Sequence, residues 1–354
     1  MTVYRPEDLI AYGTALLSAG GFTPAHARQT ADVLVWANAR GTDSHGILRI
    51  PRYLEMVELG IIDPVAEPKV MRQEGAVALL EAGRAPGASA MVAAMDEAVG
   101  IAGRLGIGWC SVRNITHSGA VGYYALRAAE RGQIGIVITA SGPLMAYQGA
   151  RVSGVSTNPV AIAAPSDGVP LLLDMSTSAV ALGKIMAAKD AGTPIPEGWA
   201  IGSGGQPATD PADVATLTPM GGPKGSGLSL MFEVLASVLA ANPVITEAFS
   251  GRKGMMNGVA LALNIGSFGD PKAFLMHIAE LSGALKGLPK TPGTDEILMP
   301  GERGFRLAEE RMSSGIPLAA GTVTRLAAVA DRLGVVQPEP LSDGNDEMAD
   351  RAVV

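Results

Sequence analysis

The segment GTDSHGILRIPRY places a histidine beside groups that bind anions or carry protons. His45 follows Ser44 directly, and Arg49 and Tyr53 come four and eight residues after the histidine. An imidazole can take a hydroxyl proton near neutral pH, and an arginine fork can hold a carboxylate with two hydrogen bonds. These residue types suit an enzyme that binds a substrate by its carboxylate and removes or returns a hydroxyl proton on the same substrate.

Two local geometries are open for this segment. On a continuous helix, positions 45, 49 and 53 would share one face. Pro51 makes a continuous helix difficult because its ring would clash one turn back. The spacing therefore indicates only that the three side chains lie close together. If these residues have no catalytic role, Ser44 would cap a helix and His45 would lie on a polar surface.

A second candidate site lies in RNITHSGAVGYYA, where a predicted strand ends and a predicted helix begins. Small residues before a helix let backbone N–H groups and the helix dipole bind a phosphate or another anion. His117 stands in this loop and could face a ligand. It could equally be a loop histidine whose ring bonds the backbone.

A third candidate, PMGGPKGSGLSL, resembles a phosphate-binding loop without having its order. That motif ends in Gly-Lys-Ser/Thr, whereas Lys224 is followed here by Gly225 and Ser226. A glycine hinge with a lysine at a helix start still suits a phosphate or a carboxylate. The alternative is a close helix–helix approach that needs small residues.

Other motifs are absent or ambiguous. No complete GxGxxG follows a predicted strand, so the usual dinucleotide-binding fingerprint is missing. The spacing of cysteine and histidine predicts no metal site, and His26 and His277 fall in helix-like segments. Asp174 ends an apolar strand, where it could contact a ligand or cap the following helix.

The composition limits the class of protein. The chain has 354 residues, of which 47% are hydrophobic, and a net charge of −7 without a basic run, which argues against a nucleic-acid partner. Cys110 is the single cysteine, which fits a reducing compartment. The start, MTVYRPEDL, does not resemble a signal peptide, and the longest apolar run is too short to span a bilayer. We expect a soluble cytoplasmic protein with no membrane partner.

Helices and strands are predicted to alternate along the middle of the chain, which favours an α/β core with helices covering a sheet. The predicted helices span residues 6–19, 23–40, 51–60, 88–103, 119–131, 179–191, 225–241, 274–285, 305–314 and 323–333. The predicted strands span residues 77–81, 107–112, 134–139, 160–164, 171–175 and 259–264.

Breaks in the pattern predict the division into domains. An N-terminal helical segment (1–66) precedes a mixed α/β core (67–290), and a C-terminal helical segment (291–336) follows it. We expect the two helical segments to pack together. The polar end of the chain (337–354) is predicted to be a mobile tail.

Seven segments, in order along nearly the whole chain, resemble the malate/L-lactate dehydrogenase family, which is distinct from the Rossmann-type lactate and malate dehydrogenases. They are GTDSHGILRIPRY, RNITHSGAVGYYAL, STNPVAIAAP, LLLDMSTSAVALGK, IPEGWA, GGPKGSGLSLM and MPGERGFRLAEERMSSGIPL. Ureidoglycolate dehydrogenase, sulfolactate dehydrogenase, 2,3-diketogulonate reductase and piperideine-2-carboxylate reductase are relatives in this family.

The resemblance implies a fold that accounts for the missing fingerprint. NAD or NADP would bind to a mixed-sheet domain unrelated to the Rossmann fold. A helical domain formed from the N- and C-terminal segments would pack beside it. Members are usually homodimers with the site between domains.

The resemblance also implies roles for individual residues. Ser44 and His45 would form a proton relay, while Arg49, Tyr53 and Thr157 would bind the substrate, with Arg49 on its carboxylate. His117 would lie at the nicotinamide, where some members use it as proton acceptor. The implied cofactor contacts are His117, Ser118, Gly119, Ala120, Val121, Ser141, Asp174, Met175, Ser176, Lys224, Gly301 and Glu302.

Two positions depart from the family pattern. Ser118 stands where phenylalanine is usual, which would widen or wet the nicotinamide pocket. Lys184 stands where imine-reducing relatives carry an aspartate relay partner. This difference argues against a cyclic imine substrate and favours His117 over His45 as the principal acid/base.

The expected activity is reversible hydride transfer between NAD or NADP and a small 2-hydroxy or 2-keto acid of the malate or lactate type. Reduction of a cyclic imino acid on the same fold is the first alternative. A phosphoryl-transfer enzyme that uses the Lys224 loop, and a ligand-binding protein without catalysis, are the others.

Overall fold

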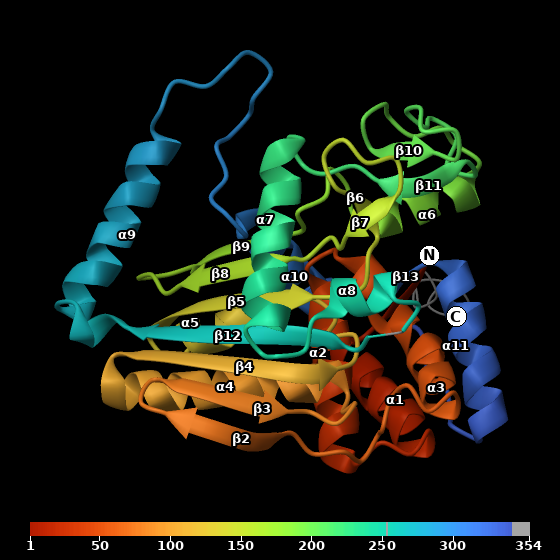
Figure 1. Ribbon diagram of the computed structural model, residues 1–354, viewed down its shortest axis with the longest axis horizontal. Coiled ribbons are helices and arrows are strands. Elements are labelled where there is room, and N and C mark those ends of the chain that lie inside the picture. Colours follow the sequence, from red (N-terminus) through yellow and green to blue (C-terminus); the bar gives the residue numbers. More distant parts are fainter. Residues whose placement is uncertain (253, 342–354) are drawn as a thin grey trace, which may run out of the picture. The chain divides into compact units, whose positions relative to one another are not determined.

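The structure is a computed structural model that describes residues 1–252 and 254–341, with the backbone alone for residues 190 and 191. Two compact units divide the chain (Figure 1). The terminal unit comprises residues 1–65 and those from 303 onward, and the central unit comprises residues 66–302. Most of the predicted tail, residues 342–354, lies outside the described residues. Among the described residues, no helix has the length and apolar character needed to cross a membrane.

The terminal unit joins both ends of the chain in one small sheet, because β1 (Thr2–Tyr4) pairs antiparallel with β13 (Ile316–Leu318). Thr23 accepts a hydrogen bond from the backbone N–H of His26 at 3.2 Å, and so caps the second helix as predicted. The helices of this unit are α1 (Pro6–Ala19), α2 (Pro24–Ala39), α3 (Ile50–Glu58), α10 (Glu302–Ser314) and α11 (Ala320–Leu333). Two 3₁₀-helices, η1 (Asp43–His45) and η2 (Ile47–Arg49), lie between α2 and α3.

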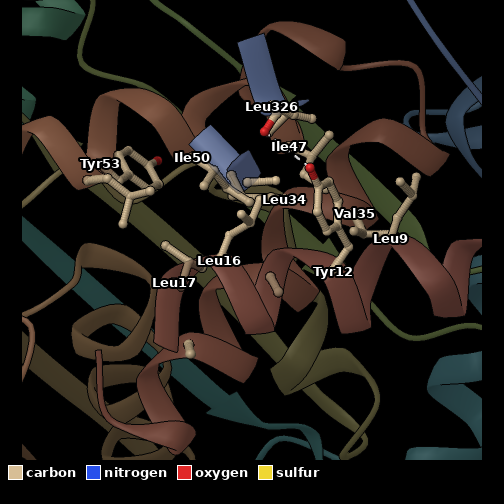
Figure 2. Packing of buried hydrophobic residues seen from close by; sticks show 14 of the residues in the cluster. Leu9, Tyr12, Leu16, Leu17, Leu34, Val35, Ile47, Ile50, Tyr53 and Leu326 are labelled. Carbon is tan, nitrogen blue, oxygen red and sulfur yellow. Dashed lines mark hydrogen bonds between the residues drawn. The ribbon is translucent and has the colours of Figure 1, made fainter. Parts of the chain in front are cut away.

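One apolar core holds the terminal unit together. Figure 2 shows side chains of α1, α2 and α3 packed together, with Leu326 of α11 at the edge of the cluster. The Tyr12 hydroxyl donates a hydrogen bond of 3.1 Å to the Leu326 carbonyl, which satisfies its polar group inside the core. The N- and C-terminal segments therefore form one helical body.

The central unit is built on a mixed seven-stranded sheet with the order β2-β3-β4-β12-β5-β8-β9. Only β3 and β4 are parallel, and the other neighbours are antiparallel. The strands are β2 (Lys69–Glu74), β3 (Val77–Glu81), β4 (Ile107–Ile115), β5 (Gln133–Ala140), β8 (Val160–Ala164), β9 (Leu171–Met175) and β12 (Met256–Asn264). This arrangement differs from the parallel Rossmann sheet and confirms the predicted mixed-sheet α/β fold.

Helices cover both faces of this sheet (Figure 1). On one face lie α4 (Gly87–Leu105) and α5 (Gly122–Ala129). They approach the sheet closely because the strands carry glycines opposite them. A Cβ on Gly135 of β5 would lie only 2.2 Å from the carbonyl oxygen of Ala125. The other face carries α7 (Pro223–Glu233) and the π-helix η3 (Val234–Val238).

A smaller four-stranded sheet, with the order β10-β11-β6-β7, has its own apolar core. Its elements are β6 (Met145–Ala146), β7 (Ser153–Val155), β10 (Ala200–Gly202), β11 (Val214–Leu217) and the neighbouring α6 (Leu182–Ala191). The remaining elements of the central unit are α8 (Val244–Phe249), η4 (Ile265–Ser267) and α9 (Pro271–Lys286). Figure 1 shows α9 standing away from the large sheet.

The structure corrects three sequence predictions. The helix predicted over residues 225–241 begins at Pro223 and changes to a π-helix after Glu233. The helix predicted over residues 119–131 spans only Gly122–Ala129, because the residues before it form the loop that carries His117. The small sheet was not predicted, since strands of two to four residues show too little alternation.

Candidate active site

The residues predicted to form a proton relay, Ser44 and His45, lie in the tight turn between α2 and α3. Ser44 Oγ and His45 Nδ1 share a hydrogen bond of 3.0 Å. The Arg49 Nε donates to the Ser44 carbonyl at 2.7 Å, so the guanidinium lies beside the histidine. The continuous helix is excluded because η1 ends at His45 and η2 begins after Gly46. The structure thus brings these residues together through 3₁₀ turns.

The Asn38 side chain of α2 holds this turn in place. Its buried side-chain oxygen accepts a hydrogen bond of 2.8 Å from the Ile47 N–H, and its nitrogen donates to Asp43 Oδ1 at 2.6 Å. A Cβ on Gly46 would lie 2.2 Å from the Asn38 side-chain oxygen, so only glycine fits. Arg311 of α10 donates to the Asn38 carbonyl and so joins the C-terminal segment to the turn.

Burial and a neighbouring charge keep the His45 ring neutral. Burial disfavours the imidazolium, and the Arg49 charge disfavours it further, so the pKa of His45 falls to about 4. Burial also raises the pKa of the Tyr53 phenol, which therefore stays protonated. At neutral pH this turn offers a neutral imidazole, a neutral phenol and a guanidinium.

In the central unit, the His117 loop joins the end of β4 to the start of α5. The Gly119 N–H donates to His117 Nδ1 at 3.3 Å, so this ring nitrogen accepts a hydrogen bond. Thr116 Oγ1 accepts from the Gly87 N–H at 2.9 Å, and a Cβ on Gly87 would clash with the carbonyl oxygens of Thr116 and His117. The start of α4 therefore supports the loop from one side. Ser118 is buried, and its carbonyl accepts from the Tyr124 hydroxyl.

Asp174, at the end of β9, caps a helix other than the one predicted. Its Oδ2 accepts a hydrogen bond of 2.9 Å from the Gly122 N–H at the start of α5, so the capped helix precedes it in the chain. A Cβ on Gly122 would lie 2.6 Å from the same oxygen. The N–H groups of Ala120 and Val121 have no hydrogen bond to any residue that the structure describes. They remain available for the anion that the sequence predicts at this helix start.

Backbone hydrogen bonds join further predicted residues to the end of β9. The Thr177 N–H donates to the Thr157 carbonyl at 3.0 Å, and the Met220 N–H donates to the Thr177 carbonyl at 2.9 Å. The buried hydroxyl of Thr177 has no hydrogen-bond partner among the described residues. Thr157, the 174–176 segment and the Lys224 loop therefore lie together.

Ser141 belongs to the same assembly. Its N–H donates to Asn158 Oδ1 at 3.2 Å, and its hydroxyl shares a hydrogen bond with the Ser156 hydroxyl at 2.5 Å. Ser229 of α7 donates to the Ser156 carbonyl at 2.7 Å, and its own carbonyl accepts from the Asn158 side chain at 2.9 Å. These buried bonds fix α7, and with it the Lys224 loop, relative to Ser141.

The Lys224 loop is a compact turn rather than an open phosphate cradle. The N–H groups of Gly222, Lys224, Gly225 and Ser226 donate to carbonyls within the turn. Gly225 lies against the backbone of Met220 and Thr177, where a Cβ would come within 2.5 Å, so the close contact is with a loop and not with a second helix. Anion binding here rests on the Lys224 ammonium, which has no hydrogen-bond or ion-pair partner among the residues described.

Gly301 and Glu302 also lie beside β9. The Leu172 N–H donates to the Pro300 carbonyl at 2.9 Å, which brings their segment to the edge strand of the large sheet. Glu302 accepts from the Met299 N–H at 2.9 Å and pairs with Lys286 at 2.5 Å.

The predicted residues thus form two groups, one in each unit. The terminal unit holds Ser44, His45, Arg49 and Tyr53. The central unit collects the predicted cofactor residues around the end of β9. Within residues 1–252 and 254–341, the amides of Ala120 and Val121, the Lys224 ammonium and the buried Thr177 hydroxyl have no partner, which fits a ligand with phosphate and hydroxyl groups. Sequence reasoning missed the supporting residues Asn38, Gly46, Gly87, Asn158 and Ser229, which have no motif of their own.

Comparison with known proteins agrees with this fold. The sequence pattern of the family described as malate/L-lactate dehydrogenase matches residues 4–327. A malate dehydrogenase of Pyrococcus abyssi is 36% identical over 341 residues, which cover 93% of this chain and 94% of the relative. A ureidoglycolate dehydrogenase (NAD(+)) of Escherichia coli O157:H7 is 32% identical over 294 residues, covering 81% of this chain and 84% of the relative.

A solved structure is similar as well. The crystal structure of malate dehydrogenase from Entamoeba histolytica matches with a TM-score of 0.90 and 28% sequence identity. The match covers 96% of this chain and 100% of the Entamoeba chain. The fold and these relatives define an oxidoreductase of the non-Rossmann type. The chain belongs to the malate/L-lactate dehydrogenase family, as the seven sequence segments predicted.

The lowered pKa of His45 gives a direct prediction. We expect the His45 ring, followed by NMR and assigned with a His45→Gln variant, to stay neutral from pH 8 down to about pH 5, well below the ordinary pKa of about 6.5. Arg49→Met removes the nearby charge, so the pKa should rise, without reaching the ordinary value, because the ring remains buried. Titration near pH 6.5 in the wild type, or no change in the variant, would contradict this electrostatic account.

Proposed function

We propose that the chain catalyses reversible hydride transfer between NAD or NADP and a small 2-hydroxy or 2-keto acid of the malate or lactate type. The observation that carries the proposal is the assembly around β9, in which five separated segments with predicted cofactor residues meet the segment of the predicted substrate residue Thr157. Family membership supports the same reaction class. The bound nicotinamide would accept or deliver the hydride.

Residues of the central unit would hold the cofactor. The N–H groups of Ala120 and Val121 and the Lys224 ammonium suit its phosphates. The Asp174 carboxylate, which lies at the end of β9 beside the start of α5, suits a ribose hydroxyl. Ser118, Gly119, Ser141, Met175, Ser176, Gly301 and Glu302 complete the proposed contacts.

Arg49 would hold the substrate carboxylate. Its Nε is engaged with the Ser44 carbonyl, which fixes the guanidinium and leaves the two terminal nitrogens for the two oxygens of an acid. Tyr53 and Thr157 would contact the substrate. A bound carboxylate would offset the Arg49 charge, so the pKa of His45 would rise when substrate binds.

The hydrogen-bond pattern favours His45 as the principal acid/base, although the sequence favoured His117. His45 has the Ser44 hydroxyl as a partner within 3.0 Å, which orients its ring and can relay a proton. His117 accepts an N–H at Nδ1, so the neutral ring carries its proton on Nε2 and is a hydrogen-bond donor there. We therefore assign proton transfer to His45 and hydrogen bonding at the nicotinamide to His117.

We further propose that the protein works as a cytoplasmic homodimer. The single cysteine, Cys110, is buried and forms no disulfide, which suits a reducing compartment. The family resemblance supports the dimer.

The proposed activity is tested with a panel of 2-keto acids and cyclic imines, each with NADH and with NADPH, by following the loss of nicotinamide absorbance. We expect turnover of a small 2-keto acid with at least one of the cofactors. Turnover of cyclic imines alone would favour the alternative, and failure to bind either cofactor would contradict the proposal.

Arg49→Lys should lose more activity than conservation of charge suggests. Lysine offers one point charge in place of a fork, so a contact of about 1.5–3 kcal/mol is lost and kcat/KM should fall roughly ten- to hundred-fold. Arg52→Lys, on an exposed side chain of α3, is the matched control. Equal kcat/KM for Arg49→Lys and wild type toward the best 2-keto acid would exclude the proposed carboxylate contact.

Replacing each histidine separates their roles. His45→Gln should lower kcat about 10²–10⁴-fold while cofactor affinity stays near the wild-type value, because general acid–base catalysis has this magnitude. His117→Gln should weaken cofactor binding more than His45→Gln does. If His117→Gln loses the turnover and His45→Gln keeps it, the two assignments must be exchanged.

A further inference from the structure

Strand β4 carries an irregularity just before the His117 loop. The strand lies between β3 and β12 in the large sheet (Figure 1), and its pairing with β12 shifts register near its end. There Arg113 and Asn114 together face the single residue Asn257, which is a β-bulge. Asn114 has a φ of 58°, in the left-handed region that asparagine tolerates better than most residues. The extra residue reverses the alternation of β4, so it changes which of the following side chains faces each side of the sheet.

Every polar group of Asn114 has a hydrogen bond. Its N–H donates to Asn257 Oδ1 at 3.1 Å, and its carbonyl accepts from the Arg84 N–H at 2.8 Å. Its side-chain oxygen accepts from Asn242 Nδ2 at 2.9 Å, and its side-chain nitrogen donates to the two Glu81 oxygens at 2.9 and 3.1 Å. Glycine alone would satisfy the φ angle, so the asparagine side chain serves these contacts rather than the turn.

The partners of Asn114 are fixed in turn. Asn242 Nδ2 also donates to Asn257 Oδ1 at 2.8 Å, and Asn257 Nδ2 donates to the Asn242 carbonyl at 2.7 Å. The Glu81 carboxylate accepts a further hydrogen bond from Arg113 Nε at 2.8 Å. Asn257 is fully buried, where the local dielectric strengthens such bonds. Because these groups support one another, the network gives the bulge one defined geometry.

A short, anchored stretch of chain joins the bulge to His117. Ile115 is the last residue of β4 and is still paired with β12. Thr116 Oγ1 donates to the Ala85 carbonyl at 3.1 Å and accepts from the first N–H of α4. These contacts leave the chain little freedom to compensate for a change at Asn114. A displacement of the bulge would therefore be passed on to His117.

We propose that Asn114 is a positioning residue for His117. Through the bulge it sets where the imidazole lies, and so whether the ring can hydrogen-bond at the nicotinamide. Asn114 itself would touch neither the cofactor nor the substrate. The inference rests on the proposed function for the role of His117, whereas the position of the ring follows from the amide network alone.

Histidine NMR on the full chain tests the position of the ring without any cofactor. Asn114→Gly keeps the left-handed backbone and removes the side-chain contacts. We expect the His117 ring resonances, assigned with His117→Gln, to move in this variant, because the hydrogen bond from the Gly119 N–H to Nδ1 is altered. The other histidines of the chain should keep their resonances. Unchanged His117 resonances, or equal movement of all the histidines, would overturn the proposal.

Two further variants make this comparison specific. Asn264→Gly is the matched control, because Asn264 is also partly buried and lies at the opposite end of β12. It should leave His117 unchanged, and movement as large as in Asn114→Gly would contradict a specific role. Asn114→Asp keeps the shape of the side chain and the acceptor for Asn242, but replaces the donor to Glu81 with a carboxylate oxygen. It should move the His117 resonances even if Asn114→Gly does not fold, and an unchanged spectrum would overturn the proposal.

A double-mutant cycle on cofactor affinity tests the consequence for the proposed function. Asn114→Gly and His117→Gln should each weaken binding of the preferred reduced cofactor, the first by roughly tenfold, a size typical of coupled residues. The double variant should bind no more weakly than the weaker single variant, because Asn114 acts through His117. Additive losses would mean that Asn114 acts by another route and would overturn the proposal. If the wild type binds neither cofactor, the proposed reaction fails, while the NMR comparison still decides whether Asn114 positions His117.

Discussion

The hydrogen bond between Asp174 and the Gly122 amide is the contact on which the central unit's site depends. It joins the end of edge strand β9 to the start of α5, at a distance of 2.9 Å. The same strand receives the segment before Gly301, through Leu172, and the residues after it hold Thr157 and the Lys224 loop. Six stretches of chain that are far apart in sequence therefore meet at one end of one strand. The Gly122 position cannot take a side chain without breaking this bond.

The terminal unit holds the residues predicted for proton transfer and for the substrate carboxylate. Asn38 holds the turn in which Ser44, His45 and Arg49 interact, and the contact from Arg311 shows why both ends of the chain are needed to build it. Burial and the Arg49 charge together keep His45 neutral until an acid binds. A substrate carboxylate would thus bind to Arg49 and, by offsetting its charge, make His45 a better proton acceptor. In the proposed reaction, the Arg49 guanidinium would couple substrate binding to proton transfer.

Much of the fold was predictable from the sequence because local patterns carry it. Proline and threonine mark the start of α2, and apolar runs mark β5, β8 and β9. The short strands of the small sheet were not predictable, since they depend on partners far away in the chain. The π-helical turn after Glu233 was missed for a similar reason: the buried Glu233 carboxylate accepts from the N–H groups of Val244 and Ile245, a tertiary contact.

The site was predictable where family segments mark it and unpredictable where packing supports it. The motifs located Ser44, His45, His117 and Lys224, but no spacing rule connects Asp174 with an amide 52 positions earlier. The sequence left Asp174 as a ligand group or a cap for the following helix, and its observed partner is a different helix. Asn38 gives no signal in the sequence, since it lies inside a helix of ordinary composition.

The central claim is that the cofactor binds to the assembly around the end of β9. Fluorescence titration of NADH, or of NADPH if that is the preferred cofactor, into wild type and Asp174→Ala tests it most directly, with Asp167→Ala in the same β8–β9 hairpin as control. We expect Asp174→Ala to bind at least tenfold more weakly, because it loses the cap of α5 and the proposed ribose contact, and Asp167→Ala to bind as the wild type does. Equal affinity of Asp174→Ala and wild type, with both proteins folded, would contradict the account.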